Sequence, residues 1–236
     1  MNQQQLMSRV WPDWSSFLTT IPAEAAYLGP WEASRREECQ ARMFDYVARS
    51  VAEPVEYLEF GVGTGSSLRA AGGAFAHADS RFFGFDTFSG HPEDWHGRIE
   101  GYAIREDIIF SSRDIFQPAG AFDVRGRTPA ETGVVVDPRA EFIRGLVQDT
   151  LPAFLEGFQP RGPLVVNIDI NLYSGALFIL ATLHNLVRRG DIIMFDELYD
   201  LDGEFLALNN YLKAFNMQGR FVCCCHDGKV FGFRIV

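Results

Sequence analysis

A glycine-rich turn between a strand and a helix constrains this chain more than any other feature. The turn is Glu59-Phe60-Gly61-Val62-Gly63-Thr64-Gly65-Ser66, which follows the apolar residues Val55, Tyr57 and Leu58 and precedes a helix-forming stretch over 66–71. Glycine reaches positive φ and has no Cβ atom to keep a ligand away from the backbone. Such a turn before a helix N-terminus indicates an α/β fold that binds a nucleotide-like group. A tight turn without a ligand is the alternative.

The spacing of these glycines separates two classes of cofactor. A dinucleotide-binding fold carries G-x-G-x-x-G, but Ser66 or Leu68 stands where the third glycine belongs. A nicotinamide-dependent oxidoreductase is therefore disfavoured. The E-x-G-x-G-x-G pattern instead resembles the S-adenosylmethionine (SAM) site of class I methyltransferases. This resemblance implies that the cofactor is bound by Glu59, Gly61, Gly63, Gly65 and Ser66.

A second acid supports adenosine binding. The apolar strand expected over 81–86 ends in Asp86, about 20 residues after the last glycine, and Thr87 follows it. A carboxylate at the tip of this strand can accept both hydroxyl protons of a ribose. NAD and SAM folds share the feature, so it does not choose between them. An isolated Asp after a strand is otherwise a turn or capping residue.

Composition limits the class of protein. The 236 residues are 47% hydrophobic, which suits one α/β domain with a sizeable core. The net charge of −10 argues against a nucleic-acid partner. No apolar run is long enough to span a membrane, and the N-terminus lacks the pattern of a signal peptide. Cys39 and the consecutive Cys223-Cys224-Cys225 predict reduced, core-filling thiols in a cytoplasmic protein.

Alternating strand and helix patterns predict a Rossmann-like class I methyltransferase fold. Strands are expected over 55–60, 81–86, 141–145, 164–169 and 191–196, with a final hairpin over 221–225 and 230–235 around Asp227-Gly228. Helices are expected over 66–76, from a cap at Asp149 or Thr150, over 174–187 and over 204–215. The outline is a mostly parallel seven-stranded sheet that ends in an antiparallel hairpin, with helices on both faces.

Two segments stand apart from this domain, which is expected over 34–236. Residues 1–33 form an irregular N-terminal segment that is a lid, an oligomer contact or simply packing against the sheet. Ser34 is expected to cap the next helix, with Glu37 completing a capping box. Residues 97–140 are too long for an ordinary loop. They form either a binding lid or an insertion with its own helix or hairpin.

Three carboxylates follow neighbouring strands. Asp169 ends one expected strand, Asp196 ends the next, and Glu197 follows directly. The carboxyl ends of parallel strands lie side by side about 5 Å apart, so these acids converge beside the glycine turn. A hard cation would relieve their repulsion, and oxygen ligands suit Mg²⁺, to which Asn171 can add a carbonyl oxygen. The alternative is that Asp169 and Asp196 cap the helices that follow them.

The combination of motifs resembles the macrocin O-methyltransferase family over roughly residues 35–200. It comprises the glycine turn, Gly84-Phe85-Asp86-Thr87-Phe88-Ser89-Gly90-His91-Pro92, Gly145 with Asp149-Thr150-Leu151-Pro152, Asp169-Ile170-Asn171-Leu172-Tyr173-Ser174, and Phe195-Asp196-Glu197. The resemblance implies SAM- and Mg²⁺-dependent methylation of a hydroxyl, often on a sugar of a macrolide antibiotic. It implies cofactor contacts at Thr87, Gln148 and Asp149, and metal ligands at Asp169, Asp196 and Glu197. Asn171 and Glu197 depart from the aspartates that are usual there.

The expected reaction is an SN2 transfer of the methyl group to a hydroxyl of a small-molecule acceptor. Asp169 and His91 are the candidate bases, with His96 a further loop histidine. Tyr173 and Trp95 are expected either to pack in the core or to contact the acceptor. A metal-free SAM methyltransferase and a SAM-binding protein without catalysis remain alternatives. The acceptor is not named by any motif, and the apolar N-terminal segment makes a homodimer plausible.

Overall fold

The computed structural model describes residues 25–29, 36–99, 102–105, 108–110, 113–225 and 230–236. Its elements are β1 (Ala26–Tyr27), α3 (Arg36–Ala48), β2 (Glu56–Phe60), α4 (Ser66–Ala74), β3 (Arg81–Asp86), β4 (Trp95–Ile99), β5 (Tyr102–Arg105), β6 (Ile108–Phe110), β7 (Arg113–Gln117), η3 (Ala130–Thr132), β8 (Ala140–Arg144), α5 (Val147–Gly157), β9 (Leu164–Ile168), α6 (Tyr173–Leu183), β10 (Ile192–Phe195), α7 (Glu204–Ala214), β11 (Gly219–Cys225) and β12 (Val230–Ile235). The predicted cap Ser34, the predicted hairpin turn Asp227-Gly228 and most of the segment 1–33 lie outside the described residues.

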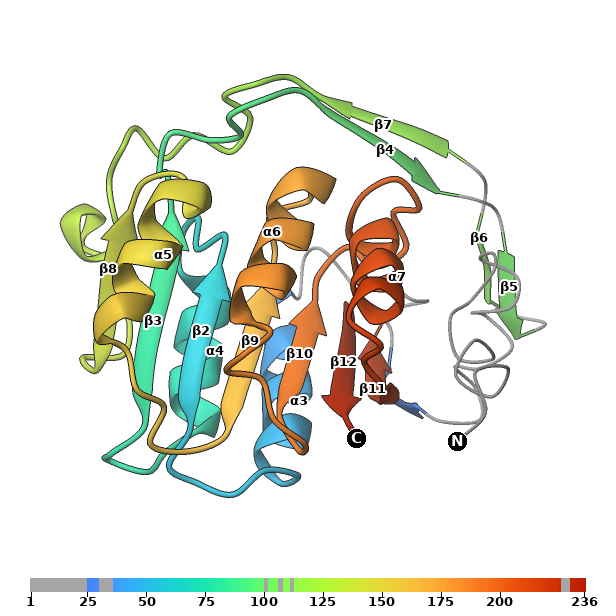
Figure 1. Cartoon of the computed structure of the whole chain (residues 1–236). Helices are drawn as coiled ribbons and strands as arrows, with labels where there is room; N and C mark the ends of the chain where they lie inside the picture. Colours follow the sequence, from blue (N-terminus) through green and yellow to red (C-terminus); the bar gives the residue numbers. More distant parts are fainter. Residues whose placement is uncertain (1–24, 30–35, 100–101, 106–107, 111–112, 226–229) are drawn as a thin grey trace.

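One large sheet organises the molecule, with strand order β1-β11-β12-β10-β9-β2-β3-β8 (Figure 1). The strands from β8 to β10 are parallel to their neighbours, while β12 runs antiparallel between β10 and β11. The predicted parallel sheet with a final antiparallel hairpin is therefore confirmed. An eighth strand, β1, pairs with β11 and falls within the segment that we expected to be irregular. Its two residues are too few to carry a strand pattern.

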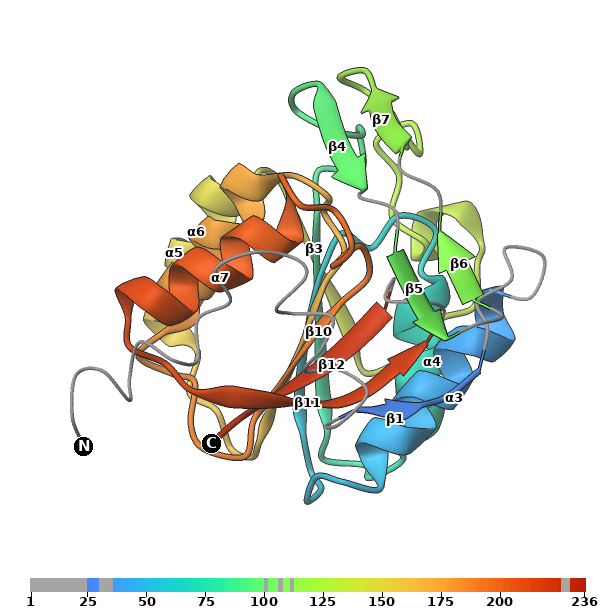
Figure 2. The same ribbon diagram turned by 90° about the vertical axis from the view of Figure 1, so that its right-hand side faces the viewer.

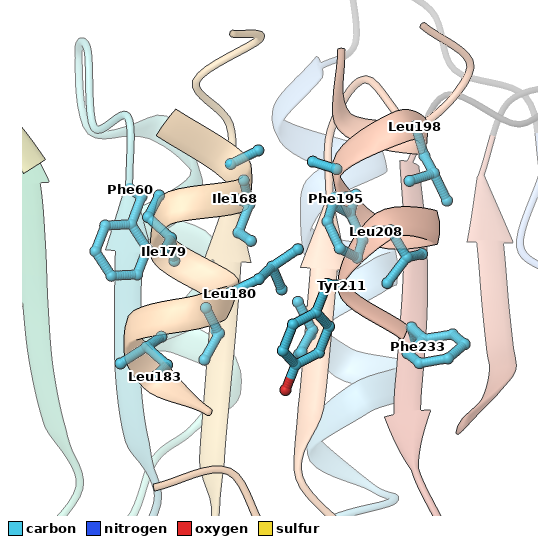
Figure 3. Close-up of a cluster of buried hydrophobic side chains, with 14 of the residues drawn as sticks. Phe60, Ile168, Ile179, Leu180, Leu183, Phe195, Leu198, Leu208, Tyr211 and Phe233 are labelled. Atoms are coloured by element: carbon cyan, nitrogen blue, oxygen red, sulfur yellow. The ribbon is translucent and has the colours of Figure 1, made fainter. Parts of the chain in front are cut away.

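Helices cover both faces of the sheet (Figure 2). Helices α5, α6 and α7 lie on one face, and α3 and α4 lie on the other. Strands β2 and β9 are buried along their whole length, because helices cover them from both sides. On the α6/α7 face, Phe60, Ile168 and Phe195 of the strands meet Leu180, Leu208 and Tyr211 of the helices (Figure 3).

Some helix ends differ from the sequence prediction; α4, for example, ends at Ala74 and not at 76. Helix α5 begins at Val147 with Leu146 as its N-cap, so the predicted cap at Asp149 or Thr150 is wrong. The reason is Gly145, whose φ of +142° turns the chain directly after β8 and starts the helix earlier. Helix α6 ends at Leu183 and not at 187, because the N–H of its C-cap residue His184 bonds to Ala181 O, three residues back, in a tighter turn.

Residues 97–140 contain structure of their own. Strands β4 and β7 form an antiparallel ribbon, and β5 pairs with β6 farther along it. The ribbon leaves the sheet beyond the carboxyl end of β3 and arches over that edge (Figure 1). Asp200, which is fully buried, fixes it: one carboxylate oxygen accepts the Trp95 indole N–H at 2.9 Å and the other accepts the Arg98 backbone N–H at 2.8 Å.

The cysteines are buried free thiols, as predicted. Among the described helices, none is both long and apolar enough to cross a membrane.

Candidate active site

A cavity of about 390 Å³ opens at the carboxyl ends of β2, β3, β9 and β10. Parallel sheets bind ligands at this edge, where the chain leaves neighbouring strands in opposite directions. Here β3 lies on one side of β2 and β9 on the other. The volume lies in the range of small-molecule and cofactor sites. The predicted site residues that line the cavity are Gly61, Gly63, Ser66, Asp86, Thr87, His91, Gln148, Asp169, Asp196 and Glu197.

Two glycines of the turn have different physical roles. A Cβ atom on Gly61 would lie 1.8 Å from the carbonyl oxygen of Asp169, so no other residue fits there. A Cβ atom on Gly63, at φ +51°, would meet nothing within 4 Å. The backbone of Gly63 is therefore bare toward the cavity, as a cofactor cradle requires. Gly65 is the N-cap of α4 and packs against Pro129, outside the lining.

Glu59 lies beneath the turn and does not line the cavity. Its carboxylate accepts hydrogen bonds from the hydroxyls of Tyr57 and Ser67, the latter at 2.8 Å. Burial raises the pKa of Glu59 to about 7, and these hydrogen bonds oppose that rise only in part. Glu59 therefore supports the glycine turn from the side that faces away from the cavity.

Asp86 joins the second strand to the glycine turn. Its Oδ2 accepts the N–H of Gly63 at 2.8 Å, and its Oδ1 accepts the N–H of Phe88 at 2.7 Å. Each carboxylate oxygen has a second lone pair, so Asp86 can still accept the hydroxyls of a ribose in the cavity. Farther along the wall, Gln148 lines the cavity, whereas its neighbour Asp149 does not.

The acids after β9 and β10 share one arginine. Arg36, the first described residue of α3, lies 3.3 Å from Oδ2 of Asp169 and 4.0 Å from Oδ2 of Asp196. Burial lowers the pKa of Arg36, but the charges of Asp196, Asp169 and Glu197 outweigh it and raise the pKa overall. The capping alternative is wrong, because Leu172 caps α6 and Gly203 caps α7.

The arrangement of these acids bears on the predicted magnesium site. Carboxylate oxygens are the ligands that Mg²⁺ prefers, but they must approach it to about 2.0–2.1 Å. The guanidinium of Arg36 already lies against Asp169 and Asp196. In the part of the chain that the structure describes, no three Asp, Glu, His or Cys side chains are grouped so as to hold a metal ion. The residues as arranged do not fit Mg²⁺.

His91 and Asn171 form a second polar pair on the cavity wall. The His91 Nε2 lies 3.2 Å from the Asn171 Nδ2. His91 Nδ1 and Asn171 Oδ1 are buried and have no hydrogen-bond partner among the described residues. Burial lowers the pKa of His91, so its ring is neutral near pH 7. His96 lies instead on the ribbon, exposed and 5.0 Å from the ring of Phe116.

Sequence reasoning missed two parts of the site. The cavity is also lined by Phe122, Asp123 and Val124, which follow the second strand of the ribbon. The sequence carries no motif there. Arg36 stands in an ordinary helical stretch, and only its contact with two distant acids reveals it. Trp95 and Tyr173, for which core packing or acceptor contact was open, do not line the cavity. Trp95 is buried, and the Tyr173 hydroxyl accepts a bond from Asn210 at 3.0 Å.

Solved structures share this architecture, although no family model and no curated protein matches the sequence. The calicheamicin methyltransferase CalS11 is 20% identical with a TM-score of 0.59, over 99% of this chain and 98% of that one. A second structure describes CalS11 as a TDP-rhamnose 3′-O-methyltransferase. The O-methyltransferase NovP is 20% identical with a TM-score of 0.57, over 85% of this chain and 79% of that one.

A third structure is the S-adenosylhomocysteine-bound methyltransferase PaMTH1 of Podospora anserina. It is 13% identical with a TM-score of 0.51, over 99% of this chain and 85% of that one. The likeness in each case extends along most of both chains. Together with the strand order, it establishes that this chain has the class I methyltransferase fold.

Proposed function

We propose that this protein is a SAM-dependent methyltransferase that acts on a hydroxyl group of a small molecule. The observation that carries the proposal is the cavity in which the bare backbone of Gly63 meets the carboxylate of Asp86. These are the two contacts that a nucleoside-bearing cofactor needs at the carboxyl edge of a parallel sheet. The likeness to CalS11 and NovP supports methyl transfer as the chemistry.

The chain's own residues would divide the work. Bound SAM would supply a methyl group on a sulfonium, and the carbon–sulfur bond would break with its electron pair left on sulfur as the acceptor oxygen bonds to carbon. The glycine turn and Asp86 would hold the cofactor, so that the acceptor oxygen and the methyl carbon are kept in line. The released hydroxyl proton must pass to a base on the cavity wall.

Asp169 and His91 are the two candidates for that base. Both line the cavity, Asp169 beside the cation of Arg36 and His91 as a neutral ring. A pH profile of kcat/KM separates them. If His91 is the base, His91→Ala removes the acid limb of the profile; if Asp169 is the base, Asp169→Asn removes it and His91→Ala leaves it in place.

The acceptor that we propose is a sugar hydroxyl of a natural product. CalS11, which acts on TDP-rhamnose, has the same fold over nearly its full length. The acceptor side of the cavity combines apolar Phe122, Pro92 and Leu172 with the polar pair of His91 and Asn171. Apolar surface packs against the carbon face of a sugar, and the buried polar atoms can form hydrogen bonds with its hydroxyls.

The remaining expectations concern the family, the metal, the location and partners of the protein, and its oligomeric state. The macrocin family remains the proposed relationship on the strength of the shared motifs. That family implies magnesium dependence, but the residues as arranged do not fit the ion, so we assign no step to it. Addition of EDTA tests the dependence. A cytoplasmic location, a homodimer, and the absence of nucleic-acid and membrane partners are likewise proposed. Light scattering tests the oligomeric state.

Calorimetry with SAM and S-adenosylhomocysteine tests the cofactor, and mass spectrometry of products from a panel of sugar nucleotides, glycosides and phenols tests the reaction. We expect both ligands to bind and one sugar class to gain a methyl group. Lack of binding would overturn the cofactor assignment. Binding without turnover on any acceptor would favour a non-catalytic SAM-binding protein. The matched negative control is Asp86→Ala.

A further inference from the structure

The carboxylate pair at the cavity already has a cation, and that cation belongs to the chain. Asp169 and Asp196 come from the ends of adjacent strands, whereas Arg36 comes from α3 on one covered face of the sheet. One nitrogen, Nη2 of Arg36, lies 3.3 Å from Oδ2 of Asp169 and 4.0 Å from Oδ2 of Asp196. Each acid thus turns its Oδ2 toward the same guanidinium group.

This contact matters because the acids are largely withdrawn from water. The side chain of Asp169 is 16% exposed and that of Asp196 is 8% exposed, and Glu197 follows beside them. Carboxylates placed so close repel one another unless a positive charge lies among them. Among the described residues that line the cavity, Arg36 is the one arginine, and there is no lysine. A guanidinium keeps its charge at every accessible pH.

A divalent ion and this guanidinium compete for the same oxygens. Magnesium needs its ligands at about 2.0–2.1 Å, so an ion between Asp169 and Asp196 would have to displace Arg36. Arg36 also lines the cavity, and its side chain is 44% exposed.

We propose that Arg36 is the resident cation of this site and that the protein uses it in place of a divalent metal. The guanidinium holds Asp169 ionised and fixed in direction, so Arg36 is a positioning residue that acts through Asp169. The inference rests on the proposed methyl transfer, which then proceeds without a metal. It concerns the occupant of the carboxylate pair, and direct ion binding tests it independently of turnover.

The experiment is a titration with Mn²⁺, monitored by the electron paramagnetic resonance signal of the free ion. The parent chain is expected to show no stoichiometric site at this pair. Arg36→Met removes the cation and leaves an unbranched apolar side chain in place of the arginine stem, and we expect it to bind one Mn²⁺ at least tenfold more tightly than the parent. Adding Asp196→Asn to that variant should abolish the gain. Arg69→Met, which removes an arginine paired with Glu37 outside the cavity, should behave as the parent does.

Two results would overturn the proposal. One is a parent chain that binds one Mn²⁺ with an affinity that Asp196→Asn abolishes, a measurement that needs no arginine variant to fold. The other is a folded Arg36→Met with no gain in Mn²⁺ affinity. Failure of S-adenosylhomocysteine to bind would instead count against the proposed function. With an active acceptor, turnover should survive EDTA, fall at least tenfold in Arg36→Met and be partly restored in Arg36→Lys.

Discussion

At the scale of single residues, neighbours in one motif have separate tasks. The sequence predicts a ligand turn over Gly61–Gly65. In the structure the carbonyl of Asp169 leaves no room for a side chain at Gly61, whereas Gly63 is open to the cavity. Such a distinction depends on what lies across the turn, more than 100 residues away in sequence, and no local pattern contains it. The register of Asp86 with the turn, by contrast, follows from spacing alone, because adjacent parallel strands end at one edge.

The first prediction concerns Asp86. Asp86→Ala removes the acceptor for the ribose hydroxyls and for the Gly63 N–H. Loss of such a charged hydrogen-bond partner costs about 1.5–3 kcal/mol, or roughly ten- to a hundredfold in affinity. Calorimetry with S-adenosylhomocysteine measures it. Asp79→Ala, at an exposed position outside the cavity, is the control and should bind as the parent does.

The second prediction concerns the pH dependence of folding. The pKa of Glu59 is raised from 4.5 to about 7, so between these values the folded chain holds a proton that the unfolded chain has released. Stability therefore falls as the pH rises through this window, by on the order of 3 kcal/mol in total. Glu59→Gln cannot titrate, and its stability should depend less steeply on pH.

Urea unfolding at about pH 5 and about pH 8 measures this difference. Exposed Glu156 on α5 supplies the control substitution, Glu156→Gln, which should leave the parent's pH dependence in place. If the free energy of unfolding changes equally with pH in the parent and in Glu59→Gln, Glu59 ionises normally in the folded chain.

At the scale of elements, strands buried on both faces were the most predictable part of the fold. Runs such as 164–168, which is apolar except for Asn167, leave few alternatives to a central parallel strand. The ribbon of β4 and β7 was unpredictable for the opposite reason. Its strands are short, carry mixed polar residues and are held by Asp200, which lies 105 residues from Trp95. Only the length of 97–140 indicated that something had to form there.

The third prediction tests that anchor. Asp200→Ala leaves the Trp95 indole and the part-buried Arg98 backbone N–H without their acceptor, and the buried indole alone costs about 1–3 kcal/mol. Asp202→Ala removes only the half-exposed pair with the Arg98 side chain, which is worth about 0–1 kcal/mol. Urea unfolding should rank the two variants in that order, and limited proteolysis should cut the ribbon of Asp200→Ala first. Equal effects would mean that Asp200 does not hold the ribbon.

At the scale of the whole molecule, the cavity joins the two halves of the sheet. Its walls come from β2 and β3 on one side of the strand-order reversal and from the ends of β9 and β10 on the other. A ligand bound there contacts both halves of the folded chain and has no comparable site in the unfolded one. Binding must therefore appear as stability of the entire domain.

The last prediction uses this linkage to decide the class of cofactor. At 100 times its dissociation constant, S-adenosylhomocysteine should stabilise the fold by about 2.7 kcal/mol. For a chain of this size that corresponds to a rise in Tm of roughly 5–10 °C. Asp86→Ala at the same ligand concentration should lose at least about 1.4 kcal/mol of this gain, because its affinity is at least tenfold lower. NAD⁺ should give no rise, since Ser66 and Leu68 replace the glycine that a dinucleotide turn requires. A rise in Tm with NAD⁺ and none with S-adenosylhomocysteine would instead indicate a nicotinamide-dependent oxidoreductase that binds its cofactor in this cavity.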